Sequence, residues 1–202
     1  MATPFTVLTA AAVALDRANV DTDQIIPARF LKQPRGVGYG QFLFHDLRAG
    51  EDGFPLDAPA AAGAAILVAA RNFGCGSSRE GAVYALVDGG IRCVIAPSFG
   101  DIFASNAAKN GLLTIALEEA RIAALLARLT AMPGSTMTVD LPAQRLTDPD
   151  GATCDFAIDP FRKRCMVEGL DDVALTLEYA AAIAAYDRRI ATEEGWRIPQ
   201  PG

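Results

Sequence analysis

Continuous apolar runs separated by helical patterns occupy the middle of the chain. Three of these runs have the length of a strand: residues 64–70, 91–96 and 112–117. Such runs are typical of strands buried on both faces. One helical pattern begins at Ser77 and ends before Gly89, and the next extends from Ser98 to Lys109. The alternation predicts parallel strands joined by helices.

The two ends of the chain have different patterns. Weak alternation predicts two short strands near the N-terminus, residues 5–10 and 12–15. The second half predicts a helix over 118–131, strands over 136–141 and 154–158 joined by a turn at 148–151, helices over 161–168 and 171–191, and an irregular tail over 196–202. We therefore expect residues 1–202 to form a single α/β domain, with a mixed sheet covered by helices.

The composition narrows the classes of protein. A chain of 202 residues that is 51% hydrophobic can bury a substantial core. The net charge is -6, which argues against a nucleic-acid-binding surface. The first basic residue is Arg17, and the apolar stretches are too short to span a bilayer. We expect a cytoplasmic protein that binds neither nucleic acid nor membrane.

The cysteines and the histidine show no metal-binding spacing. Cys75, Cys93, Cys154 and Cys165 contain no Cys-x-x-Cys pair, and His45 is the one histidine. We interpret the cysteines as free thiols in a reducing compartment. The sequence therefore predicts no metal site in this chain.

The turn after the first buried run has the most distinctive chemistry. Residues 71–80 read Arg-Asn-Phe-Gly-Cys-Gly-Ser-Ser-Arg-Glu. Arg79 stands where a dinucleotide fingerprint needs its third glycine, so a Rossmann site is excluded. The sequence also contains no P-loop and no Gly-x-Ser-x-Gly elbow. His45 is distant in sequence from the serines and gives little support to a Ser-His-Asp triad.

A strand-to-helix turn of this composition indicates an anion site. Free backbone N–H groups and the Arg79 guanidinium can hold a carboxylate or phosphate, and glycines let a ligand approach the backbone. Ser77 or Ser78 would act as a base only if the helix N-terminus stabilised its alkoxide. The alternative is an ordinary helix that begins with a Ser77–Glu80 capping box, with Ser98 capping the next helix.

Two further segments are candidates for the same site. Asp21, Thr22 and Asp23 could orient or bind a partner group, or Asp21 could simply form an Asx-turn that starts the next element. Arg35 lies in a glycine-rich loop over residues 32–41 and would either contact substrate or remain solvated.

These motifs occur together in a known family. Six stretches carry the similarity: residues 18–27, 72–80, 94–99, 161–165, 169–171 and 175–177. On these residues the chain resembles the small subunits of the 3-isopropylmalate dehydratases (isopropylmalate isomerases), which belong to the aconitase superfamily. The resemblance covers nearly the whole chain.

The resemblance implies a fold, a partner and a reaction. The fold would be the swivelling β/β/α domain of aconitase, and the partner a large subunit that carries a 4Fe-4S cluster. The heterodimer would isomerise 2-isopropylmalate and 3-isopropylmalate by dehydration and rehydration in leucine biosynthesis. Ser77 would be the alkoxide base, Ser78 and Arg79 would hold a substrate carboxylate, and Asp23 would orient groups at the subunit junction.

Two positions depart from the family pattern. Gly81 stands where the family usually has a histidine after Ser-Arg-Glu. Gly36 stands where the substrate loop usually has an arginine, and Arg35 lies one place earlier. Two alternatives therefore remain: a paralogous hydro-lyase subunit for another hydroxydiacid such as citraconate or a methylated malate, and a non-enzymatic diacid-binding module.

Overall fold

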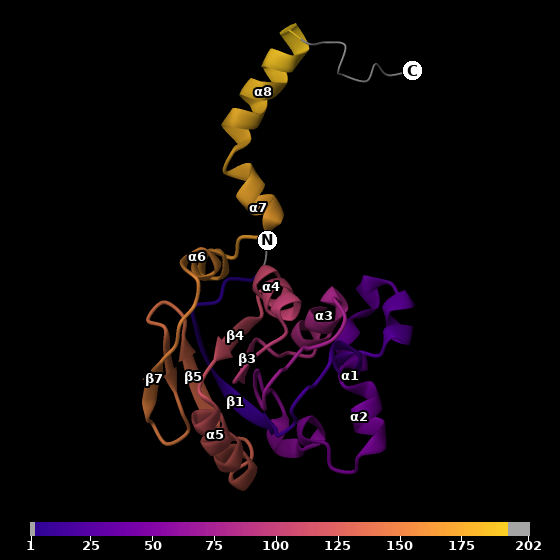
Figure 1. The fold of residues 1–202 in the computed structure, drawn as a ribbon, viewed down its shortest axis with the longest axis vertical. Helices are drawn as coiled ribbons and strands as arrows, with labels where there is room; N and C mark the ends of the chain where they lie inside the picture. The colour runs from indigo at the N-terminus through magenta and orange to yellow at the C-terminus, as the bar shows by residue number, and fades with distance from the viewer. Residues whose placement is uncertain (1–2, 194–202) are drawn as a thin grey trace.

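A seven-stranded sheet forms the centre of the structure, a computed structural model that describes residues 3–193 (Figure 1). The strands are β1 (Val7–Leu15), β2 (Ile66–Ala69), β3 (Cys93–Ala96), β4 (Leu113–Ala116), β5 (Thr136–Asp140), β6 (Arg145–Thr147) and β7 (Thr153–Asp155). Their order is β4-β3-β2-β1-β5-β6-β7. The first four strands pair in parallel, and β5, β6 and β7 add antiparallel neighbours. The mixed sheet predicted from the sequence is confirmed.

Helices cover both faces of this sheet (Figure 1). They are α1 (Thr22–Ile25), α2 (His45–Gly50), α3 (Glu80–Asp88), α4 (Asp101–Lys109), α5 (Glu119–Ala131), α6 (Pro160–Glu168), α7 (Asp172–Leu177) and α8 (Ala180–Glu193). Short 3-10 helices span Ala28–Lys32, Arg35–Val37, Tyr39–Phe42, Pro55–Asp57 and Pro59–Ala61. No helix within residues 3–193 is both long and apolar enough to cross a bilayer.

Alternating side chains of the parallel strands build two separate cores. Leu67 of β2 faces a cluster that includes residues of α3 and α4, whereas Ile66 and Val68 face a cluster that includes residues of α5 and β5. Successive side chains of a strand point to opposite faces, so a strand covered on both sides must be apolar throughout. This burial explains the continuous apolar runs.

Several elements differ from the predicted ones. The helices α3 and α4 begin at Glu80 and Asp101, each three residues later than predicted, and β7 ends at Asp155. The two short N-terminal strands are one strand, β1, whose residues 7–11 pair with β5 and whose residues 12–15 pair with β2. The short strand β6 was not predicted, because only one of its three residues, Leu146, is buried. The helix predicted over 171–191 is divided into α7 and α8. The tail predicted over 196–202 lies outside the described residues.

The turn between β2 and α3 packs tightly against α4. Gly74 is buried with a φ of 71°, and a Cβ atom built on it would lie 2.2 Å from Cγ of Phe103. A Cβ atom on Gly100 would lie 2.4 Å from the Gly74 carbonyl oxygen. Gly74 therefore serves the internal packing of the turn, whereas the sequence suggested close approach of a ligand as the reason for its glycines.

The variant Gly74→Ala tests this packing. We expect its free energy of unfolding to fall by roughly 2–4 kcal/mol, because the methyl group meets the Phe103 ring and alanine is strained at positive φ. Gly50→Ala is the matched control, since Gly50 lies in α2 with open space around it. Chemical denaturation of both variants measures the effect, and equal stability of the two would contradict the packing argument.

Candidate active site

The loops that follow β1 and β2 meet at the carboxyl edge of the sheet. After β1 and β2 end, their loops pair once more, through a parallel bridge between Asp21 and Cys75. The Thr22 N–H donates to the Cys75 carbonyl over 3.0 Å, and the Gly74 N–H donates to the Val20 carbonyl over 2.7 Å. The structure thus brings together the Asp21-Thr22-Asp23 segment and the 72–79 turn, which the sequence singled out separately.

Two asparagines fix the start of these loops. Asn19 and Asn72 both have left-handed backbone angles, with φ of 58° and 61°, and the Asn72 side chain donates to Asn19 Oδ1 over 2.8 Å. Asparagine adopts this conformation more readily than most residues. The Asn72 N–H donates to Ser98 Oγ over 2.9 Å, so Ser98 braces the turn. The prediction that Ser98 caps the next helix is wrong, since the N-cap of α4 is Gly100.

Thr22 anchors the turn from beneath. Its side chain is 3% exposed, and Oγ1 donates to the Ser77 carbonyl over 2.9 Å. Asp21 is the N-cap of α1: its carboxylate accepts from the Gln24 N–H over 2.8 Å, and the Gln24 side chain accepts from the Asp21 N–H. The Asx-type alternative for Asp21 is therefore confirmed, and Thr22 is the member of the segment that holds Ser77.

Asp23 and Arg79 form an ion pair across the two loops. Asp23 also accepts from the Ala28 N–H over 3.1 Å, and its side chain is 51% exposed. The hydrogen bond from Arg79 lowers the pKa of the Asp23 carboxyl below its ordinary value. Arg79 has five N–H donors, so one carboxylate does not exhaust its capacity to bind another.

The helix after the turn begins without a side-chain cap. The N-cap of α3 is Arg79 and its first residue is Glu80, so the predicted Ser77–Glu80 capping box is wrong. Glu80 instead accepts from the Asn110 side chain over 2.8 Å. Ser77 and Ser78 are exposed, and their hydroxyls make no hydrogen bond to another residue within 3–193. Two free hydroxyls and a guanidinium therefore stand at the positive end of α3, which suits an anionic ligand.

The structure does not bring Arg35 to this turn. Arg35 is ion-paired with Asp88, with Nη2 and Oδ1 at 2.8 Å, and its guanidinium carbon lies 4.3 Å from the centre of the Tyr84 ring. Asp88 is the last of the nine residues of α3, so it lies about 12 Å along the helix axis from Glu80. A substrate contact from Arg35 remains a prediction.

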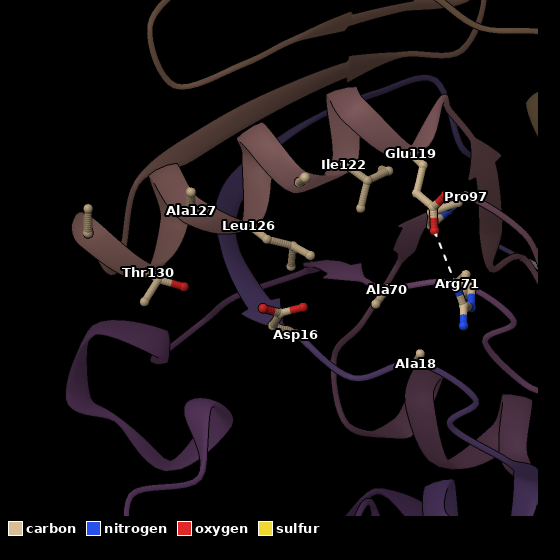
Figure 2. Close-up of a pocket in the computed structure, with 12 residues that line it drawn as sticks. Asp16, Ala18, Ala70, Arg71, Pro97, Glu119, Ile122, Leu126, Ala127 and Thr130 are labelled. Atoms are coloured by element: carbon tan, nitrogen blue, oxygen red, sulfur yellow. Dashed lines mark ion pairs between the residues drawn. The ribbon is translucent and has the colours of Figure 1, made fainter.

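A cavity of about 540 Å³ opens on the other face of the sheet, beneath α5 (Figure 2). Ile122 and Leu126 of α5 face it, and the exposed ion pair between Arg71 and Glu119, at 3.7 Å, lies at one end. The predicted site residues do not line it. Within residues 3–193, no group of three or more histidines, cysteines and carboxylates could hold a metal ion.

The comparisons with known proteins first identify the class. Residues 2–120 match the family described as Aconitase C-terminal domain, and residues 123–160 match the family described as LeuD_N. A crystal structure of 3-isopropylmalate dehydratase from Methanocaldococcus jannaschii is 27% identical to the chain. It superposes with a TM-score of 0.62 and covers 90% of this chain and 99% of that one. The fold is thus an aconitase-type α/β fold.

Sequence relatives then identify the family. The 3-isopropylmalate dehydratase small subunit of Rhodopseudomonas palustris BisA53 is 50% identical over 197 residues, which cover 95% of this chain and 98% of the relative. The small subunit of Magnetococcus marinus is 48% identical over 206 residues, with 95% and 97% covered. The chain belongs to the family of 3-isopropylmalate dehydratase small subunits.

Removal of the Thr22 hydroxyl tests its anchoring role. We expect Thr22→Val to lower the free energy of unfolding by roughly 1–3 kcal/mol, because the Ser77 carbonyl loses its donor at a buried position. Thr136→Val, at an exposed position of β5, controls for the change of residue type. Denaturant titration compares the two variants. A Thr22→Val protein as stable as the control would show that the hydrogen bond does not hold the turn.

The Asp23–Arg79 pair has a pH dependence of definite sign. The pKa of Asp23 in the fold lies below its ordinary value of 3.8, so the pair stabilises the fold above that pH. This contribution is lost as the pH falls through the lowered pKa. We expect carboxyl NMR titration to give a pKa below 3.8 in the wild type and a higher value in Arg79→Gln. An identical Asp23 pKa in both proteins would contradict the pairing.

Proposed function

We propose that this chain is the small subunit of an isopropylmalate isomerase in the cytoplasm. With a large subunit it would interconvert 2-isopropylmalate and 3-isopropylmalate by dehydration and rehydration in leucine biosynthesis. The observation that carries the proposal is the exposed turn at the N-terminus of α3, which presents two serine hydroxyls and a guanidinium. This turn occurs in a chain that is similar over nearly its full length to named small subunits.

Ser77 is the proposed base of the reaction. Its alkoxide would remove the carbon-bound proton of the substrate, and the proton would return from Ser77 during rehydration. A serine alkoxide is accessible only where positive charge stabilises it. The N-terminus of α3 and the neighbouring Arg79 supply that charge, and no side-chain cap competes for the first N–H groups of the helix.

Ser78 and Arg79 are the proposed carboxylate site. The guanidinium can bind a carboxylate through two parallel hydrogen bonds, and the Ser78 hydroxyl can donate a third. Asp23 would orient Arg79 through their ion pair. Asp21 and Thr22 would act through the backbone, by capping α1 and by holding the Ser77 carbonyl.

The proposal places the 4Fe-4S cluster on the large subunit. The described residues contain no ligand set for it: Cys93 is buried, and no group of three or more histidines, cysteines and carboxylates among them could hold a metal ion. When bound in the complex, the cluster would supply a Lewis acid for departure of the substrate hydroxyl. The chain itself would contribute the base and the carboxylate contacts.

Two observations favour a test of substrate range. Arg35 is held by Asp88 instead of facing the turn. A Cβ atom on Gly81 would lie 2.4 Å from Leu31 Cδ2, so Leu31 fills the space beside the position where the family usually has histidine. These two departures from the family pattern are the reason to test diacids with a different side group. Citraconate and methylated malates are therefore the second candidate substrates.

The experiment is anaerobic turnover by the chain reconstituted with its cognate large subunit. We expect Ser77→Ala to lower kcat by roughly 10²–10⁴-fold with unchanged assembly, because the base is lost. Ser105→Ala, on α4, is the matched serine control and should retain wild-type turnover.

The outcomes separate the candidates. Turnover of 3-isopropylmalate that depends on Ser77 supports the proposal. Turnover of citraconate or a methylated malate alone would keep the mechanism and change the substrate. Diacid binding by the isolated chain, with no turnover in the complex, would indicate a non-enzymatic module. Near-normal activity of Ser77→Ala would show that Ser77 is not the base.

A further inference from the structure

The C-terminal helices extend away from the rest of the molecule (Figure 1). We call residues 172–189 the arm; it comprises α7 and most of α8. Every residue from 176 to 189 is exposed. Isolated helices of six and fourteen residues are only marginally stable in water, and most helices gain their stability from packing of an apolar face. The arm has the features of a helix whose packing partner is another chain.

One face of the arm is apolar. Ile183 and Tyr186 of α8 are 42% and 53% exposed, and their spacing of three residues places them on the same side of the helix. Tyr179, which is 67% exposed, lies in the turn just before α8, four residues before Ile183. Val173 and Leu177 add an exposed apolar pair on α7. Contiguous exposed side chains of this size are typical of protein–protein contacts. We call Tyr179, Ile183 and Tyr186 the apolar stripe.

The base of the arm is linked to the start of α3 through the end of α4. Asp172, the first residue of α7, accepts from Lys109 Nζ over 3.2 Å. The next residue, Asn110, binds Glu80 over 2.8 Å, and Glu80 directly follows the Ser77–Arg79 turn. At the far end of α7, Glu178 is ion-paired with Arg164 of α6. The arm is thus attached to α4 and α6 at the two ends of α7, and the end of α4 links its base to Glu80, the residue after the candidate turn.

We propose that the apolar stripe binds the large subunit and holds it over the catalytic turn. This inference rests on the proposed function, because that function requires the large subunit to approach the turn before Glu80, and the end of α4 connects Glu80 with the base of the arm. The exposed residues of the turn are few and small, whereas a stable interface buries about 800 Å² on each partner. The two tyrosines of the stripe would contribute on the order of 200 Å². A second copy of this chain is the rival occupant.

Two double variants of the full-length chain separate these occupants. Ile183→Glu with Tyr186→Glu places two charges on the stripe, and Ala181→Glu with Ala184→Glu places two charges at the same spacing away from it. All four positions are exposed, so neither variant disturbs the core. Calorimetric titration with the cognate large subunit gives the Kd, anaerobic turnover gives kcat, and sedimentation velocity gives the state of the chain alone.

We expect the stripe variant to raise the Kd by at least about 30-fold, as loss of interface anchors does, and the control variant to change it by less than about 3-fold. The kcat at saturating large subunit should stay near the wild-type value in both. Equal Kd values in an active wild-type complex would overturn the inference and leave the proposed function intact.

Two other outcomes would also overturn it. A chain that dimerises alone through the stripe, with an unchanged Kd for the large subunit, would show that a second copy covers the arm. A wild-type chain that neither binds the large subunit nor turns over a diacid would refute the proposed function, and the inference with it.

Discussion

The candidate site depends on the parallel pairing of β1 with β2. In a parallel pair the carboxyl ends of both strands lie at the same edge, so the loops that follow them begin side by side. Here the pairing continues past the strands through the bridge between Asp21 and Cys75. The register therefore places Thr22 under the Ser77 carbonyl, and Asp23 beside Arg79. A shift of one residue would turn the side chains of these loops to the opposite faces.

The turn is supported by packing and hydrogen bonds on one side and is exposed on the other. Phe103 packs against Gly74, and Thr22 and Ser98 bind backbone groups of the turn. The hydrogen bonds among these contacts are made to backbone groups, so the Ser77 and Ser78 hydroxyls stay exposed. A site that must place a base beside a carboxylate needs such support, because a small displacement of the reacting groups lowers the rate strongly.

Three features of the structure agree with the proposed partnership with a large subunit. The candidate turn is exposed to solvent, the described residues offer no ligand set for a metal, and the C-terminal arm carries exposed apolar side chains. Each of these features is expected if a second protein binds at the carboxyl edge of the sheet. In the proposed function this chain would supply the base and the carboxylate contacts, and the partner would supply the remaining chemistry.

The sequence by itself determined the sheet and the chemistry of the turn. Continuous apolar runs require burial on both faces, and glycine, serine and arginine act through their own conformational freedom and functional groups. Tertiary structure decided which segments meet. It joined the two halves of β1, since their different partners are remote in sequence, and it gave Asn19, Asn72 and Thr22 their roles. The tertiary structure also pairs Arg35 with Asp88 and starts α3 after Arg79, without the predicted Ser77 cap. Such contacts depend on distances between atoms in space, which local sequence spacing does not encode.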